Sequence, residues 1–141
     1  MPIRVLLVDD EEQFVETLAE RLQMREFDVR TAHTGEEALV SLKEEETDVV
    51  VLDVLMPGKD GIETLREIKK QSPMTEVMML TGHATMDSAI QGLKFGAYDY
   101  LMKPTETEDL VAKILKAYAR KLEQEERIRR AESDKASQNK S

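Results

Sequence analysis

Residues 5–10 read VLLVDD, an apolar run that ends in two adjacent aspartates. A short apolar run bounded by polar residues is typical of a buried β-strand. One aspartate after a strand commonly caps the next helix, but a second adjacent negative charge needs a further reason. The stretch therefore raises two questions: which sheet holds this strand, and what the paired carboxylates do at its end.

Five such runs alternate with segments of helical periodicity. The strand-like runs are IRVLLV (3–8), FDVRTA (27–32), DVVVLD (48–53), EVMMLT (76–81) and AYDYLM (97–102). Two of the intervening segments open with predicted capping boxes, Thr34 with Glu37 and Thr105 with Glu108. Gly96 is expected to end the fourth helix. Five βα units in succession predict an α/β fold, (βα)5, with a parallel sheet covered by helices on both faces.

The composition of the runs predicts the strand order. The first, third and fourth runs are almost wholly apolar, as expected for strands buried on both faces. The second run alternates apolar and polar residues, and the fifth carries Asp99, so we expect these two at the sheet edges. Right-handed crossovers then favour the doubly wound, flavodoxin-like order 2-1-3-4-5, in which the crevice lies between the first and third strands.

Composition limits the functions open to the chain. Its 141 residues are 40% hydrophobic, enough for one globular domain. There is no cysteine, which excludes disulfides and thiolate metal sites, and no apolar stretch approaches the roughly 20 residues of a membrane span. The net charge of −9 disfavours direct nucleic-acid binding. We expect a soluble cytoplasmic protein without a secretory leader or membrane segment.

The predicted sheet collects polar residues at one edge. Asp9 and Asp10 follow the first strand, Asp53 ends the third, Thr81 ends the fourth, and Lys103 follows the fifth. Any one of the aspartates could be a helix cap or a turn residue, and Lys103 could be a solvated edge residue. Because the carboxyl ends of parallel strands meet at one edge, their joint occurrence indicates a site.

Three neighbouring carboxylates require a counterion. Two carboxylates about 4 Å apart repel by roughly 4 kcal/mol at an effective dielectric constant of about 20, so the group must take up a proton or a cation. Oxygen ligands without histidine or cysteine favour Mg²⁺. With Asp53 as nucleophile, a metal ion, Lys103 as a cation and Thr81 as a hydroxyl donor, the parts of a phosphoryl-transfer site are present.

At these residues the sequence resembles the receiver domain of two-component response regulators. The matching motifs are VDD (8–10), LDVLMPGKDG (52–61), TGHA (81–84) and GAYDYLMKP (96–104). The resemblance covers residues 1–119 with the motifs in the expected order and spacing. It implies a phosphoprotein that receives its phosphoryl group from a sensor histidine kinase or a phosphotransfer protein.

The resemblance also implies roles for individual residues. Asp53 would be the phosphoacceptor. Asp10, Asp53 and the backbone carbonyl of Leu55 would bind Mg²⁺, with Asp9 assisting through water. By the same resemblance, the Lys103–Pro104 peptide bond is cis.

The resemblance implies roles for three further residues. Lys103 would pair with the phosphate. Thr81 and Tyr100 would form a switch pair that remodels the surface of the fourth helix, fifth strand and fifth helix, where a downstream protein binds. The family does not act as a general enzyme, although its members assist their own phosphorylation and dephosphorylation.

One enzyme class remains an alternative, a Mg²⁺-dependent phosphohydrolase with an aspartyl nucleophile, as in haloacid-dehalogenase-type enzymes. Such enzymes place an Asp-x-Asp motif after the first strand and usually carry a cap domain. This chain has adjacent aspartates and no segment for a cap, which favours the receiver interpretation.

Residues 120–141 differ in charge from the rest, with seven Lys and Arg against five Asp and Glu. Glu123/Arg127, Glu125/Arg129 and Glu126/Arg130 have the favourable i,i+4 spacing, so we expect the last helix to run on into solvent. We expect the polar end SDKASQNKS to be disordered. The extension could be the strut of a phosphorylation-dependent homodimer, a docking helix or the start of a linker, and we expect no output function to be encoded in these residues.

Overall fold

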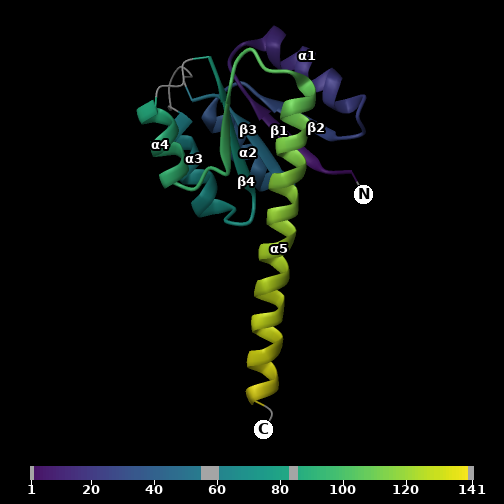
Figure 1. Ribbon diagram of the computed structural model, residues 1–141, viewed down its shortest axis with the longest axis vertical. Helices are drawn as coiled ribbons and strands as arrows, with labels where there is room; N and C mark the ends of the chain where they lie inside the picture. The colour runs from purple at the N-terminus through teal and green to yellow at the C-terminus, as the bar shows by residue number, and fades with distance from the viewer. Residues whose placement is uncertain (1, 55–60, 83–85, 140–141) are drawn as a thin grey trace.

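The computed structural model describes residues 2–54, 61–82 and 86–139. Figure 1 shows an α/β domain from which one long helix projects. In chain order the elements are β1 (Arg4–Val8), α1 (Glu12–Gln23), β2 (Asp28–Ala32), α2 (Gly35–Glu44), β3 (Val49–Leu52), α3 (Gly61–Gln71), β4 (Glu76–Thr81), α4 (Met86–Lys94), β5 (Asp99–Met102) and α5 (Thr107–Asn139). The predicted alternation of strands and helices is confirmed.

All strand pairs are parallel, and the order is β2-β1-β3-β4-β5. This confirms the predicted order, with the half-polar strands β2 and β5 at the edges. At the centre Val5 of β1 stands opposite Val29 of β2 and Val49 of β3. Strands β1, β3 and β4 therefore end side by side, because each central strand is held in register by two neighbours.

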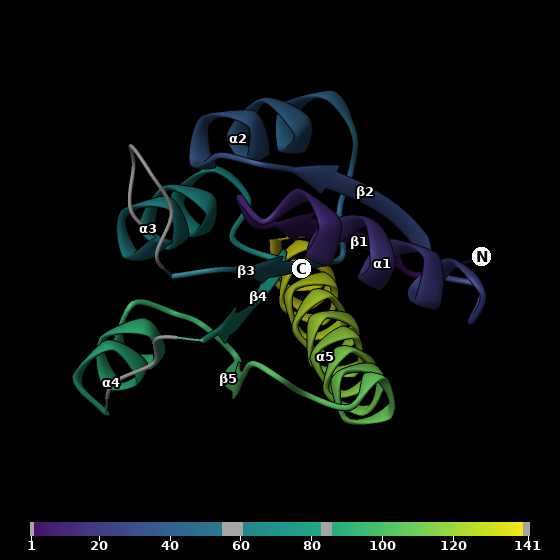
Figure 2. The same ribbon diagram turned by 90° about the horizontal axis from the view of Figure 1, so that it is seen from above.

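Two apolar cores lie on opposite faces of the sheet. Alternate residues of β1 point to different faces, so Val5 and Leu7 pack with α1 and α5, whereas Leu6 and Val8 pack with α2 and α3. Figure 2 shows α1 and α5 together on one side and α2, α3 and α4 on the other. Helices thus cover both faces of the sheet, as its apolar central strands predict.

The helix ends agree with the predictions in part. Thr34 caps α2 by accepting a hydrogen bond from the amide of Glu37 at 3.1 Å. Gly96, at φ 107°, ends α4. The predicted capping box of Thr105 and Glu108 is wrong, because α5 begins at Thr107 and the Glu108 side chain pairs with Arg25, which follows α1.

Helix α5 leaves the domain along its own axis, and its last turns lie far from the sheet (Figure 1). The disorder predicted from Ser133 is wrong for the described residues, because the helix continues through Asn139. Residues 120–139 contain no glycine or proline, and adding a residue to an existing helix needs no new nucleation. Of the predicted charge pairs, Glu126–Arg130 is formed at 3.2 Å, whereas Glu125 pairs with Lys121 at 3.3 Å. Within the described ranges, no helix combines the length and apolar composition of a membrane span.

Candidate functional site

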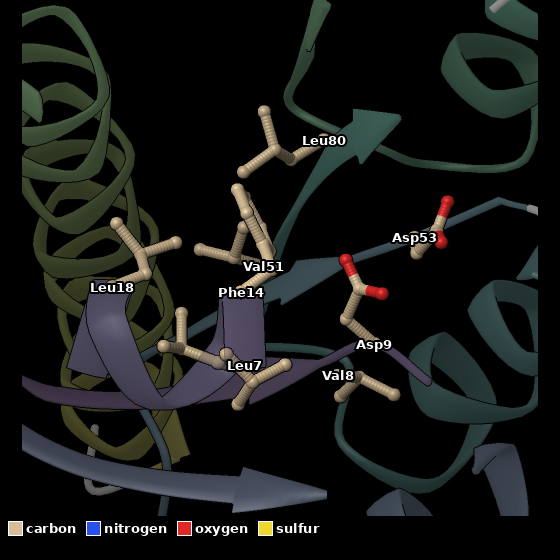
Figure 3. Close-up of a pocket in the computed structure, with 9 residues that line it drawn as sticks. Leu7, Val8, Asp9, Phe14, Leu18, Val51, Asp53 and Leu80 are labelled. Atoms are coloured by element: carbon tan, nitrogen blue, oxygen red, sulfur yellow. The ribbon is translucent and has the colours of Figure 1, made fainter. Parts of the chain in front are cut away.

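The predicted site residues meet at the carboxyl edge of the sheet. Asp9 and Asp53 directly follow β1 and β3, and Thr81 is the last residue of β4. The amide of Asp53 donates to the carbonyl of Val8 at 2.9 Å, which holds the two strand ends together. Asp9, Asp53 and Thr81 are 4%, 5% and 1% exposed, so their side chains are taken out of bulk water. Figure 3 shows the side chains of Asp9 and Asp53 next to each other at this edge.

Asp10 completes a cluster of three carboxylates. Asp9, Asp10 and Asp53 each offer an oxygen, and these oxygens all lie within 4.8 Å of one another. Asp10 is exposed, so one side of the cluster is open to solvent. Oxygens at this spacing fit a small divalent cation that keeps some of its water, as Mg²⁺ does. The donor set of the chain therefore fits the metal predicted from the sequence.

Lys103 is the cation within the cluster. Its ammonium donates to Asp9 Oδ2 at 2.6 Å and to Glu11 Oε1 at 3.1 Å, and it lies 3.8 Å from Asp53 Oδ2. Burial alone would lower the pKa of Lys103, but the hydrogen bonds to Asp9 and Glu11 outweigh it and raise that pKa. The ammonium also lies 4.3 Å from the centre of the Phe14 ring. Lys103 is therefore held charged beside the phosphoacceptor candidate.

The sequence did not single out three residues that position this cluster. The Glu11 amide donates to Asp9 Oδ1 at 3.0 Å, and its side chain binds Lys103. His33, directly after β2, places Nδ1 3.2 Å from the carbonyl oxygen of Asp9. Phe14 contributes its ring beneath Lys103. Glu11 and His33 come shortly after β1 and β2, next to the crevice. This position in the sequence is the signal by which they could have been found.

A small cavity lies behind the two buried carboxylates, between α1 and the sheet (Figure 3). Its volume is about 10 Å³, room for one water molecule at most. Its walls are mostly apolar: Leu7, Val8, Phe14, Val15, Leu18, Val51 and Leu80, with Asp9 and Asp53 at one side.

The predicted switch pair lies on one face of the sheet. Met79 stands opposite Tyr100, and Thr81 stands opposite Met102, so side-chain alternation places Thr81 and Tyr100 on the same side. That side is covered by α4 (Figure 2). Tyr100 is 38% exposed, so its ring is not enclosed in the domain.

Gly61 permits the close approach of α3 to the site. A Cβ at this position would stand 2.4 Å from Val54 Cα and 2.6 Å from the Asp53 carbonyl oxygen. Any other residue at 61 would therefore displace the backbone that carries Asp53. Leu55, whose carbonyl we expected to bind the metal, lies outside the described residues.

Residues 5–115 match the family described as the response regulator receiver domain. The chain belongs to this receiver-domain family. Its members serve as signalling domains of two-component systems, and they generally bind Mg²⁺ through an acidic pocket such as the aspartate cluster found here.

Among curated relatives, the transcriptional regulatory protein CpxR of Klebsiella pneumoniae is 44% identical over 111 residues, which cover 79% of this chain and 47% of that protein. CpxR of Escherichia coli K12 is 43% identical over the same length. The receiver domain thus spans about half the length of the curated relatives it matches.

Solved structures share the fold. A CheY-like receiver domain from Methanospirillum hungatei superposes with a TM-score of 0.84 at 27% identity, over 88% of this chain and 99% of that one. NtrX from Brucella abortus, in complex with ADP, superposes with the same TM-score at 31% identity, over 89% of this chain and 29% of that one.

Proposed function

We propose that this receiver domain accepts a phosphoryl group on Asp53 from a phosphohistidine of a sensor histidine kinase or phosphotransfer protein. One observation carries the proposal: Asp53 is a buried carboxylate that shares its site with Asp9, Asp10 and the ammonium of Lys103. A carboxylate oxygen of Asp53 would attack phosphorus, the phosphorus–nitrogen bond of the donor would break, and an acyl phosphate would form. Such a reaction belongs in the cytoplasm, where kinase domains reside.

The neighbouring residues supply the charge that this transfer needs. Asp9, Asp10 and Asp53 would hold Mg²⁺, with the Leu55 carbonyl as a further ligand expected from the family. A bound Mg²⁺ neutralises negative charge on an incoming phosphoryl group. Lys103 would give up its hydrogen bond to Asp9 and donate to a phosphoryl oxygen instead. The phosphoryl group would be within its reach, because the ammonium already lies 3.8 Å from Asp53.

The response would pass through Thr81 and Tyr100. A phosphoryl group on Asp53 adds charge and hydrogen-bond acceptors that draw the Thr81 hydroxyl inward, and Tyr100 then has room to turn toward the sheet. The surface of α4, β5 and α5 carries exposed apolar side chains that suit protein binding: Ile90, Leu93, Tyr100, Met102 and Leu115. A downstream protein or a second phosphorylated copy would bind there.

Phosphorylation is tested with a small acyl-phosphate donor and Mg²⁺, with the mass of the intact protein as readout. The parent should gain one phosphate and Asp53→Asn should gain none. Asp28→Asn is the matched control, because Asp28 is an exposed aspartate on edge strand β2. Equal phosphate uptake by Asp53→Asn and the parent would show that the acceptor is another residue.

The switch is tested by backbone chemical shifts with and without the phosphate mimic beryllofluoride. We expect shifts in the Asp53 site and also across residues 86–118, which include α4, β5 and the first turns of α5. Shifts confined to the Asp53 site would mean that phosphorylation is not transmitted to this surface. Thr81→Ala, which removes the hydroxyl, should keep the local shifts and lose the distant ones.

A further inference from the structure

Buried charges also lie at the opposite edge of the sheet, where the strands begin. Asp48, directly before β3, is 2% exposed. It accepts hydrogen bonds from the Arg4 amide at 2.8 Å and from the Arg4 guanidinium at 3.2 and 3.1 Å. Its remaining partner comes from helix α5: the ammonium of Lys121 lies 2.9 Å from Asp48 Oδ1.

Lys121 stands at a position where the sequence pattern calls for an apolar residue. Leu110, Ile114 and Ala117 form the core-facing stripe of α5 and are fully buried. Lys121 continues this stripe at the next helical step and is itself only 5% exposed. Replacement of buried ion pairs by apolar residues is often neutral or stabilising, so stability alone does not explain a lysine here.

A second pair lies beside the first. Arg120 Nε is 3.9 Å from Oε1 of Glu76, the first residue of β4, which is 1% exposed. Two consecutive residues of α5 thus contact the amino ends of two central strands. They lie shortly before the part of α5 in which every side chain is exposed, from Arg127 to Lys135.

The same three strands carry the site residues at their other ends. Arg4 is the first residue of β1 and Asp9 follows its last, Asp48 and Asp53 flank β3, and Glu76 and Thr81 are the first and last residues of β4. In each case five positions separate the two residues, about 16 Å along an extended strand. The turn of α5 that leaves the domain therefore contacts the central strands at the end opposite to the carboxylate site.

We propose that Arg4, Asp48, Glu76, Arg120 and Lys121 form a joint that fixes the direction in which the α5 extension leaves the receiver domain. Apolar contacts are not directional, whereas the hydrogen bond between Lys121 and Asp48 fixes both the rotation and the tilt of the helix at this turn. A tilt of about 20° at the joint would displace residue 132, about 16 Å farther along the helix, by roughly 6 Å. The joint thereby determines where anything attached to the extension is presented, independently of the phosphorylation chemistry.

The distance between two spin labels, measured by pulsed electron paramagnetic resonance, tests the joint. Because the chain has no cysteine, labels can be placed only where cysteines are introduced. Glu44→Cys on α2 and Glu132→Cys on the extension report the direction of the helix, and both positions are exposed. Glu44→Cys with Ala112→Cys, an exposed position of α5 within the domain, is the reference pair.

Lys121→Met, which keeps the length of the side chain and removes its charge, should shift or broaden the 44–132 distances by several ångströms and leave the 44–112 distances unchanged. Arg129→Met is the matched control, because Arg129 is an exposed cation of the same helix and pairs with Glu126 on the helix itself. It should leave both distances as in the parent. A 44–132 distance distribution in Lys121→Met that matches the parent would contradict the proposed joint. The cluster would then be an ion-pair network that contributes to folding alone.

If Lys121→Met does not fold, Lys121→Leu decides, because leucine continues the buried apolar stripe of Leu110, Ile114 and Ala117 and also removes the bond to Asp48. A shifted or broadened 44–132 distribution supports the joint, and a parent-like one overturns it. Phosphate uptake by Asp53 is measured on the same variants. Normal uptake together with altered 44–132 distances separates the joint from the phosphorylation site.

Discussion

The two edges of the sheet both bury carboxylates, but they balance the charge differently. At the amino edge Asp48 pairs with Arg4 and Lys121, and Glu76 pairs with Arg120. Arg4 and Lys121 also pair with Glu46 and Glu125, so four acids there meet three cations. At the carboxyl edge the described residues place Asp9, Asp10, Glu11 and Asp53 around the single ammonium of Lys103. The amino edge is close to neutral within the chain, and the carboxyl edge keeps a larger excess of negative charge.

This difference separates structural from functional charge. A carboxylate whose hydrogen bonds and charge are satisfied inside the protein has nothing left to offer a ligand. A cluster in which several acids share one cation gains free energy whenever a metal ion or a proton binds. The comparison therefore predicts that equivalent substitutions at the two edges have opposite effects on stability and on metal binding.

The largest effect should come from Asp48→Asn. It leaves the buried ammonium of Lys121 without its principal partner, and we expect the free energy of unfolding to fall by about 3–5 kcal/mol. Asp53→Asn should have little effect or should stabilise the metal-free protein, because it removes repulsion. Urea unfolding of both variants in the presence of a chelator measures the difference. A loss of stability in Asp53→Asn as large as that in Asp48→Asn would break the comparison.

Mg²⁺ should stabilise the protein through the carboxyl edge alone. With free Mg²⁺ at about 100 times its Kd, linkage predicts a gain of about 2.7 kcal/mol in the free energy of unfolding. Asp10→Asn and Asp53→Asn should reduce this gain, whereas Asp28→Asn should keep it. The melting temperature is measured in chelator and in millimolar Mg²⁺. A parent melting temperature that is the same in both would contradict the assignment of a metal site.

Acidification should weaken the amino edge. Burial alone would raise the pKa of Asp48, but the hydrogen bonds from Arg4 and Lys121 outweigh it and lower that pKa below its usual value. The stabilisation is therefore present above the unfolded-state pKa of about 3.9 and is lost as the pH falls below it. The stability difference between the parent and Asp48→Asn, measured by urea unfolding at pH 7 and at decreasing pH, should narrow below about pH 4. A difference that stays constant would contradict this assignment.

The smallest effect concerns Glu26, in the connection that enters the amino edge between α1 and β2. Its φ of 68° lies in the left-handed region, which disfavours any residue except glycine by about 1 kcal/mol. Glu26→Gly should relieve this strain and raise the free energy of unfolding. The net gain should be only about 0.5 kcal/mol, because glycine loses more backbone entropy on folding, which offsets part of it. Phosphate uptake should not change. Urea unfolding with Glu20→Gly, inside α1, as the destabilised control measures the gain.

Local patterns determined much of this molecule. Apolar runs located the strands, the half-polar character of the second and fifth runs identified the edge strands, and right-handed crossovers then set the strand order. Because parallel strands all end at one edge, the position of Asp9, Asp53 and Thr81 after apolar runs was enough to predict that they meet. The cap at Thr34 was also predictable, because both of its partners lie within one turn.

Only the tertiary structure decided contacts between residues far apart in the chain. In the sequence, Asp48 belongs to a strand flank and Lys121 to a charged helix, and nothing local indicates that they lie 2.9 Å apart. Glu108 likewise turns from its expected cap to Arg25, 83 residues away. Periodicity reports which face of an element is apolar, because burial depends on the local alternation of residues. Pairing between distant charges depends on strand register and on the depth at which a helix docks, and these are fixed only when the whole core has packed.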